Sequence, residues 1–258
     1  MGRADIVTLP VTPKTGGLLK PQQALLFDLD DTLIDEREHQ RAVMQTCGTI
    51  ASLQDGLDAV RLFEANQEVW RAYWPEVEGQ WTLGLLDGAA LSLEAWHRTL
   101  RAYGCVDESV AKVAVEALAG HTHAAYRLYE DVPELLGLLK GRLLLGLITN
   151  GASDTQRERL GWFDLKRHFD VIVISGEVGV AKPDPAIFGL ALDNLAISED
   201  QAWYVGDSLR TDMAGAKAAG LTAVWLNRHG SKRTAGDPEP DLEIESLTEL
   251  FTVFAGTE

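Results

Sequence analysis

The chain has 258 residues, of which 46% are hydrophobic and 24% charged, a composition typical of a globular protein with a sizeable core. The formal net charge of −16 argues against nucleic acid and against an anionic membrane surface as the main partner. No apolar stretch reaches the roughly 20 residues that a membrane span needs, and the start of the chain has no apolar signal core. The two cysteines, Cys47 and Cys105, lack metal-type spacing, and we expect reduced thiols. We therefore expect a cytoplasmic protein, and we make no prediction of its oligomeric state.

The first predicted strand ends in a group of carboxylates. Residues 1–20 show no clear period, and we expect a flexible leader there. The apolar run over residues 24–29 then predicts a strand, and Asp28, Asp30 and Thr32 share one face if strand geometry persists. Two adjacent carboxylates repel each other, so a divalent cation, a shared proton or both must neutralise them.

The segment over residues 36–131 has a different character from the rest of the chain. It contains no convincing strand, and its apolar residues recur near helical spacing. We therefore expect an all-helical domain over residues 36–131, inserted into the surrounding fold.

Strand signals return after residue 132 and alternate with helical stretches. Near-continuous apolar strands that alternate with helices indicate a parallel sheet covered on both faces. We therefore predict a doubly wound, Rossmann-like α/β core built from residues 21–35 and 132–258. Residues 241–244 are a candidate edge strand, and a last helix is expected over residues 247–254. The other expected elements are strands over 143–148, 171–174, 202–205 and 222–226 and helices over 133–140, 155–160, 185–194 and 211–219.

Polar side chains follow several of these strands at the edge where open α/β sheets bind ligands. These are Thr149, Asn150 and Gly151 after the second core strand, Lys182 after the third, and Asp207 and Asp212 after the fourth. The set suits phosphoryl transfer, because a carboxylate can attack phosphorus while a second acid protonates the departing alcohol. A divalent cation, a Lys, a Thr hydroxyl and backbone amides can hold the phosphoryl oxygens.

Each motif also has an ordinary structural interpretation. The Asp-x-Asp pair is a common turn or cap signal, and Thr149-Asn150-Gly151 is a plausible end to any strand. Asp184 and Pro185 fit the start of a helix. All four motifs, each after a strand of one parallel sheet, favour a shared site.

In this combination the chain resembles the haloacid dehalogenase-like (HAD) superfamily. The Asp28-Leu29-Asp30-Asp31-Thr32 run matches the first motif of that family, Thr149 the second, Lys182 the third, and Gly206-Asp207-Ser208 with Asp212 the fourth. The helical insert has the position and size of the first type of cap domain in that family.

The resemblance implies roles for the four acidic residues. Asp28 would be the nucleophile and a Mg²⁺ ligand, and Asp30 the general acid and base, with its backbone carbonyl also on Mg²⁺. Asp207 would be a further metal ligand, and Asp212 would support the metal directly or through water.

The resemblance also implies which residues bind the phosphoryl group. Thr149 and Lys182 would hold it, and Lys182 would also pair with Asp28. Asn150 and Gly151 would line the phosphate pocket.

Asp30 separates the chemistries of the family. A halide leaves carbon without a proton, whereas an alkoxide that leaves phosphorus needs one. The sequence therefore predicts a Mg²⁺-dependent phosphatase that acts on a small phosphate monoester, such as a sugar phosphate or a nucleoside monophosphate. The alternatives are a phosphomutase or other phosphotransferase, a 2-haloacid dehalogenase, and a non-catalytic phosphate-binding or receiver-like protein.

The insert offers candidates for substrate contact, and two interpretations stay open. Its aromatic residues pack the helices or stack on the leaving group, and its arginines are solvated or reach a second anionic group. Thr149-Asn150-Gly151 followed by residues 156–160 resembles the branch that contains nucleotide and acylated-sugar phosphatases. The candidates are Trp70, Tyr73, Trp74, Trp81, Arg71, Arg98, Arg101 and, near the first motif, His39.

Overall fold

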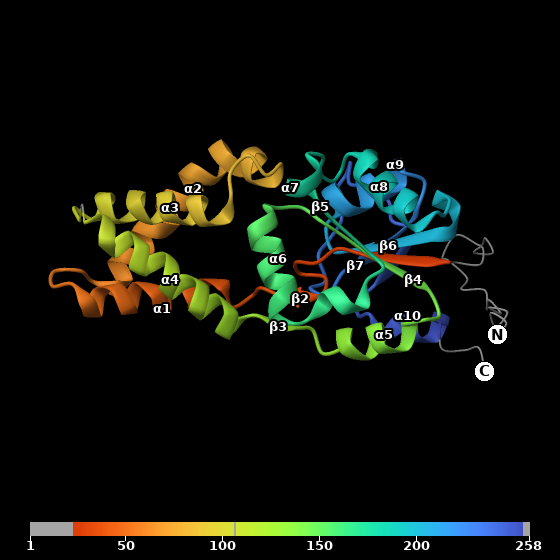
Figure 1. Cartoon of the computed structure of the whole chain (residues 1–258), viewed down its shortest axis with the longest axis horizontal. Helices are drawn as coiled ribbons and strands as arrows, with labels where there is room; N and C mark the ends of the chain where they lie inside the picture. Colours follow the sequence, from red (N-terminus) through yellow and green to blue (C-terminus); the bar gives the residue numbers. More distant parts are fainter. Residues whose placement is uncertain (1–22, 106, 255–258) are drawn as a thin grey trace.

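A parallel sheet of six strands forms the centre of the computed structural model, which describes residues 23–105 and 107–254 (Figure 1). The strands lie in the order β5-β4-β1-β6-β7-β8, and this arrangement confirms the predicted α/β fold and its edge strand. The predicted leader over residues 1–20 lies outside the described residues. The strands are β1 (Ala24–Phe27), β4 (Leu144–Thr149), β5 (Val171–Ile174), β6 (Ala202–Gly206), β7 (Thr222–Leu226) and β8 (Leu242–Ile244).

Strand β1 lies in the middle of the sheet, between β4 and β6. In the register of these pairs, Phe27 lies opposite Leu147 and Val205. Strands β4 and β5 extend the sheet on one side of β1, and β6 to β8 extend it on the other. The strand order thus reverses at β1, and open α/β sheets bind ligands at the carboxyl ends of the strands at such a point.

Helices cover both faces of the sheet (Figure 1). They are α5 (Val132–Leu139), α6 (Ser153–Trp162), α7 (Ser175–Val178), α8 (Pro185–Leu195), α9 (Ala214–Ala218) and α10 (Thr248–Phe254). Side chains alternate along β1, so Leu25 and Phe27 join the hydrophobic cluster under α5 and α10. Leu26 joins the opposite cluster, with α8 and α9. Burial on both faces explains why the strands are apolar throughout.

Three short helical turns complete the core. The turns η1 (Leu165–His168) and η2 (Glu199–Gln201) are 3₁₀-helical, and η3 (Leu209–Met213) is π-helical. The helix expected over residues 211–219 therefore begins at Leu209 as η3 and continues as α9. The wider first turn brings Asp212 close to the end of β6.

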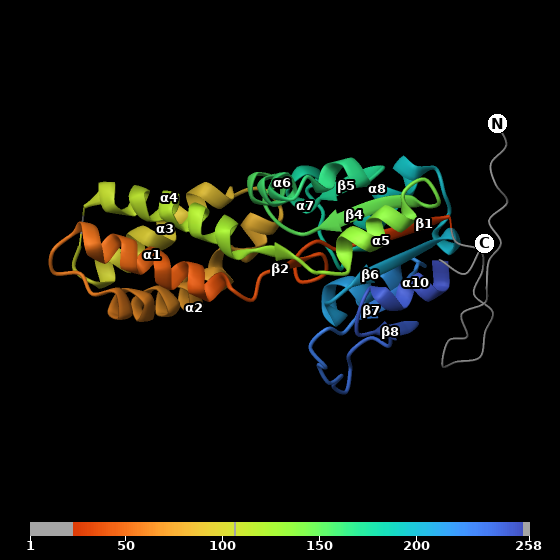
Figure 2. The ribbon, with the colours of Figure 1, turned by 90° about the horizontal axis from the view of Figure 1, so that it is seen from below.

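The inserted segment contains four helices that lie beyond one end of the sheet (Figure 2). They are α1 (His39–Leu53), α2 (Ala59–Thr82), α3 (Gly88–Ala102) and α4 (Glu108–Ala125). The last three begin at aspartates, because the side chains of Asp58, Asp87 and Asp107 accept hydrogen bonds from the first-turn amides. Trp96, which is 1% exposed, lies in the apolar core of the bundle.

One expectation for this segment is wrong. We expected no strand over residues 36–131, but β3 (Arg127–Leu128) pairs antiparallel with β2 (Ile34–Asp35). A strand of two residues is too short to show an alternating pattern, so the sequence carries no signal for it. This ribbon brings together the chain that enters the bundle and the chain that leaves it.

The bundle contacts the core at a second place, between its α2–α3 connection and helices α6 and α7. Ser175 Oγ donates to the carbonyl oxygen of Thr82 at 2.6 Å. The carboxylate of Asp154 accepts from the backbone amides of Gly88 and Ala89 at 2.9 and 3.1 Å. The bundle is therefore held over the carboxyl end of the sheet from two sides. Among the helices of the described residues, none combines the length and the apolar character that crossing a membrane requires.

The thiol of Cys47 provides a test of the packing of the bundle. Its side chain is fully buried between helices, and desolvation raises the pKa of the thiol to about 12. Since the thiolate is the reactive form, we expect no alkylation of Cys47 by iodoacetamide at pH 8 until the protein unfolds. Peptide mass spectrometry of a Cys105→Ser variant, with and without urea, measures this. Alkylation of Cys47 in the native protein at the rate of a free thiol would contradict the packing.

Candidate active site

A buried cluster of charges lies at the carboxyl end of β1. Asp28 directly follows β1, Lys182 lies in the loop before α8, and Asp212 lies in η3. Lys182 Nζ is 2.5 Å from Asp28 Oδ1 and 2.7 Å from Asp212 Oδ1. All three residues are at most 7% exposed, and buried charges of this kind need partners of opposite sign. The structure thus brings the predicted first, third and fourth motifs together.

Tyr204 completes this cluster, and the sequence analysis did not single it out. Its hydroxyl in β6 accepts a hydrogen bond from Lys182 Nζ at 3.0 Å. The Tyr204 hydroxyl also lies 3.1 Å from Asp212 Oδ1 and 3.1 Å from the carbonyl oxygen of Ile148, and both of these oxygens are acceptors for its proton. The apolar strand pattern predicts Tyr204 as a core residue. A buried tyrosine hydroxyl requires a hydrogen-bond partner, and this is the signal that could have pointed to a polar contact of Tyr204.

The carboxylates outnumber the cations at this site, and their pKa values reflect that. Burial raises the pKa of Asp28 well above its usual range; Lys182 partly opposes this, while Asp212 and Asp207 add to it. Burial and the neighbouring Asp212 raise the pKa of Asp207 to about 7. Burial lowers the pKa of Lys182, but Asp212 and Asp28 together raise it above its usual value. One lysine therefore does not neutralise the site.

Three of these carboxylates are placed to share a cation. Ligand oxygens of Asp28, Asp207 and Asp212 all lie within 4.8 Å of one another. Carboxylate oxygens are the ligands that Mg²⁺ prefers. Burial, with the neighbouring carboxylates, raises the pKa of Asp28 and of Asp207, and a cation would favour their charged forms. The residues present thus fit a hard divalent cation.

Asn150 and Thr149 lie where β4 ends, beside the charge cluster. The amide of Asn150 donates to the Lys182 carbonyl oxygen and accepts from the Lys182 backbone N–H, both at 2.9 Å. The side chain of Asn150 thus fixes the backbone of Lys182. Thr149 is 1% exposed. Thr32 Oγ1, at 3.5 Å from Asp28 Oδ2, confirms that the two side chains approach each other.

Gly151 leaves room for a tryptophan from the bundle. Its φ of +142° favours glycine, and a Cβ there would lie 2.6 Å from the Trp81 ring. Its backbone N–H donates to Ser175 Oγ at 2.8 Å. Trp81 therefore lies directly against the second motif, in space that a side chain at position 151 would need.

Asp30 is held by residues that the analysis of the strand ends did not identify. Its Oδ2 lies 2.6 Å from Arg159 Nη1 and accepts from Gln156 Nε2 at 2.9 Å. Arg159 also contacts Glu36, at 2.5 Å. Burial and the nearby Asp30 raise the pKa of Glu36 to about 9.

The other candidates from the insert are mostly engaged in packing. Trp70 and Trp74 contact each other with ring centroids 6.1 Å apart, and Trp74 contacts Trp81 at 5.4 Å. Arg98 lies over the Tyr73 ring at 3.9 Å and pairs with Glu94 and Glu76. His39 Nδ1 is 3.0 Å from the Tyr126 hydroxyl, and Arg71 is exposed.

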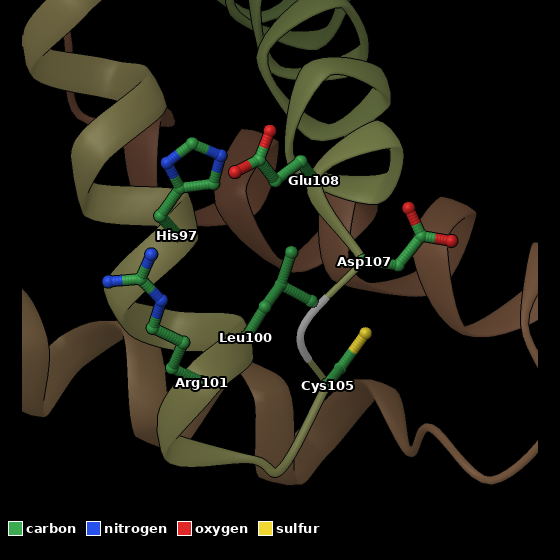
Figure 3. Close-up of a pocket in the computed structure, with 6 residues that line it drawn as sticks. All are labelled: His97, Leu100, Arg101, Cys105, Asp107 and Glu108. Atoms are coloured by element: carbon green, nitrogen blue, oxygen red, sulfur yellow. The ribbon is translucent and has the colours of Figure 1, made fainter.

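Arg101 lies far from the charge cluster. It lines a pocket between the end of α3 and the start of α4, together with His97 and Cys105 (Figure 3). The end of α3 and the start of α4 lie at the end of the bundle that points away from the sheet (Figure 1). Of the candidates in the insert, Trp81 is the one that the structure places against a predicted site residue.

Comparison with known proteins gives matches over most of the chain. The sequence model of a family described as haloacid dehalogenase-like hydrolase matches residues 22–220. A phosphoserine phosphatase from Thermus thermophilus is 34% identical, over 88% of this chain and 97% of the relative. The human N-acylneuraminate-9-phosphatase is 30% identical, over 88% of this chain and 92% of the relative.

Solved structures share the fold. A HAD phosphatase from Thermococcus onnurineus matches with a TM-score of 0.62 and 27% identity, over 91% of this chain and 99% of that chain. A 2-haloacid dehalogenase from Pseudomonas syringae matches with a TM-score of 0.66 and 28% identity, over 91% of this chain and 98% of that chain. The fold alone therefore does not separate the two chemistries.

Gly206 provides a test of the cation site. A Cβ at Gly206 would lie 2.5 Å from Asp212 Cγ, so Gly206→Ala must displace that carboxylate. We expect Mg²⁺ to raise the Tm of the wild-type protein by mass action and to raise that of Gly206→Ala far less. The control is Gly189→Ala in α8, where a Cβ meets nothing within 4 Å. Differential scanning fluorimetry measures these Tm values. Equal Mg²⁺-dependent shifts of Tm in all three proteins would contradict the assigned ligand set.

Proposed function

Because this chain belongs to the haloacid dehalogenase-like hydrolases, we propose that it is a Mg²⁺-dependent phosphatase that cleaves a small phosphate monoester through an aspartyl-phosphate intermediate. It is a phosphoric monoester hydrolase, in keeping with near full-length relatives that are named phosphatases. The observation that carries the mechanism is the contact between Lys182 Nζ and Asp28 Oδ1 at 2.5 Å, beside two further carboxylates.

Asp28 is the proposed nucleophile. It lies at the end of the central strand, and Lys182 favours its ionised form, as a bound cation would. Asp28, Asp207 and Asp212 would hold Mg²⁺, which when bound supplies positive charge against the phosphate and the carboxylates. The backbone carbonyl of Asp30 is the fourth proposed ligand.

The phosphoryl group is held by Lys182, Thr149 and the backbone around Asn150 and Gly151 in this proposal. Lys182 offers a buried positive charge, and its backbone is fixed by Asn150. A positioned cation in a site shielded from water stabilises the negative charge that develops on the transferred group. Lys182 thereby contributes to nucleophile placement and to phosphate binding.

Asp30 is the proposed general acid and base. It protonates the departing alkoxide while Asp28 attacks phosphorus, and it then takes a proton from the water that cleaves the aspartyl phosphate. A dehalogenase has no need of this second carboxyl group, so Asp30 favours the phosphatase over the dehalogenase. A phosphomutase uses the same residues, and its products would be an isomer of the substrate and no free phosphate.

The cap and the named relatives support a small phosphate ester as the substrate class. We propose residues 21–35 and 132–258 as the catalytic core and residues 36–131 as a cap that excludes water when substrate is bound. Relatives named phosphoserine phosphatase and N-acylneuraminate-9-phosphatase support a small ester, of which sugar phosphates and nucleoside monophosphates are the types to test. The net charge of −16 supports a small-molecule partner over nucleic acid, and we propose the cytoplasm as the compartment.

Phosphate release from a panel of phosphate monoesters tests the activity. We expect release with Mg²⁺ and none with EDTA. Asp28→Asn removes the nucleophile while preserving its shape, and we expect a loss on the order of 10³-fold or more. Asp193→Asn, an exposed residue of α8, is the control and should be fully active. Wild-type turnover by Asp28→Asn, or release that is indifferent to EDTA, would refute the mechanism.

Trp81 tests the role of the cap in selecting the ester. Because its ring lies against Gly151, we expect Trp81→Ala to raise KM by roughly 3- to 10-fold for the preferred ester and to change the ranking within the panel. Trp70→Ala, in the same aromatic cluster, is the control and should keep the ranking. An unchanged ranking in Trp81→Ala would rule out contact between Trp81 and the leaving group.

A further inference from the structure

Two side chains of helix α6 converge on Asp30 and have no role in the mechanism described so far. Gln156 and Arg159 are three residues apart and therefore lie on the same face of α6. Gln156 is fully buried, and the side chain of Arg159 is 14% exposed. Such a pair is costly to bury, which makes its contacts with Asp30 worth explaining.

Both side chains contact the same oxygen atom of Asp30. Gln156 Nε2 donates to Oδ2 at 2.9 Å, and Arg159 Nη1 lies 2.6 Å from that oxygen. The other oxygen, Oδ1, is buried and accepts no hydrogen bond from an N–H group or a hydroxyl of residues 23–105 and 107–254, and the carboxyl group of Glu36 is a further hydrogen-bonding neighbour of Asp30. Because Oδ2 is already occupied by two N–H groups, a proton on Asp30 is best placed on Oδ1.

Neither side chain is free to turn away from Asp30. Gln156 Nε2 also donates to the carbonyl oxygen of Asn150 at 2.7 Å, which links it to the residue that fixes Lys182. Arg159 is held between Asp30 and Glu36, and its guanidinium lies 5.4 Å from the centre of the Tyr126 ring. The two donors are therefore fixed relative to the end of β4.

We propose that Gln156 and Arg159 are positioning residues that hold Asp30 by Oδ2, so that Oδ1 is the oxygen that exchanges the proton with the leaving group and with water. This role rests on the proposed function.

One proton moves between Asp30 and a reacting oxygen in each of the two steps. In the first, a bond forms between Asp28 and phosphorus, the bond from phosphorus to the ester oxygen breaks, and the proton of Asp30 Oδ1 moves to that oxygen. In the second, a water oxygen bonds to phosphorus, its proton moves to Asp30 Oδ1, and the bond between Asp28 and phosphorus breaks. Arg159 stabilises the negative charge that Asp30 carries between the two steps.

The test compares two leaving groups on the same variants. An alkyl phosphate needs a proton on its leaving oxygen, whereas 4-nitrophenolate leaves without one at neutral pH. If Arg159 positions the acid, Arg159→Met should lower kcat/KM for the preferred alkyl phosphate by about 10²-fold. The loss for 4-nitrophenyl phosphate should stay below about threefold, because nucleophile and phosphate contacts are intact. Arg159→Lys, which keeps a charged donor, should recover most of the activity.

Arg157→Met is the matched control. Arg157 lies on the same helix but pairs with Glu177 at 2.7 Å and does not contact Asp30. It should leave both substrates unaffected. If Arg159→Met fails to fold, as judged by circular dichroism, Gln156→Leu removes the other donor to Oδ2 and should show the same selective loss.

The outcomes separate the two proposals. Equal losses on both substrates, or a selective loss in Arg157→Met, would overturn the positioning role and leave the phosphatase standing. If the wild-type protein hydrolyses no ester, or if hydrolysis does not depend on Asp28, the proposed function is overturned, and the positioning role with it.

Discussion

The site depends on one buried ammonium group that contacts two carboxylates. Lys182 lies between Asp28 and Asp212, and none of the three has enough contact with water to be stable alone. Removing the lysine would leave the buried carboxylates without a counter-charge. Removing one carboxylate would leave the buried ammonium group with one charged partner fewer. Tyr204 and Asn150 fix the side chain and the backbone of this lysine. The charge that suits phosphate chemistry is thus also the charge that holds the strand ends together.

The topology of the sheet explains why this cluster forms where it does. Strand β1 is flanked by β4 and β6, so residues that follow these three strands are neighbours in space although they are far apart in sequence. Apolar side chains on both faces leave the carboxyl edge as the place where polar groups can gather. The four-helix insert extends from that edge, and Trp81 at the end of α2 reaches back to Gly151.

Much of the core and the main acidic residues could be predicted, because strand periodicity and polar strand ends are local signals. Asp28, Lys182 and Asp212 follow strands, and the parallel pattern predicted that they would meet. The contacts that could not be predicted are those between single side chains of distant elements. Tyr204 looked like an ordinary core residue, and Arg159 looked like part of a polar helix, because neither pattern shows which buried partner a side chain meets.

The two-residue strands β2 and β3 illustrate the same limit for the backbone. They are too short for an alternating pattern, and their pairing is defined by the geometry of the joined bundle and core. The hydrogen bonds of Asn150 could not be predicted for a related reason. A polar residue after a strand can face a ligand or bind its own neighbours, and the sequence pattern does not show that the Asn150 side chain contacts the Lys182 backbone.

Chemical trapping of the covalent intermediate tests the central claim most directly. Sodium borohydride reduces an aspartyl phosphate to homoserine, so protein quenched during turnover should yield homoserine in the peptide that contains residue 28. We expect this product at Asp28 alone, and only when substrate and Mg²⁺ are both present. Turnover without a reducible acyl phosphate, or homoserine at the position of another aspartate, would contradict the assignment of Asp28 as the nucleophile.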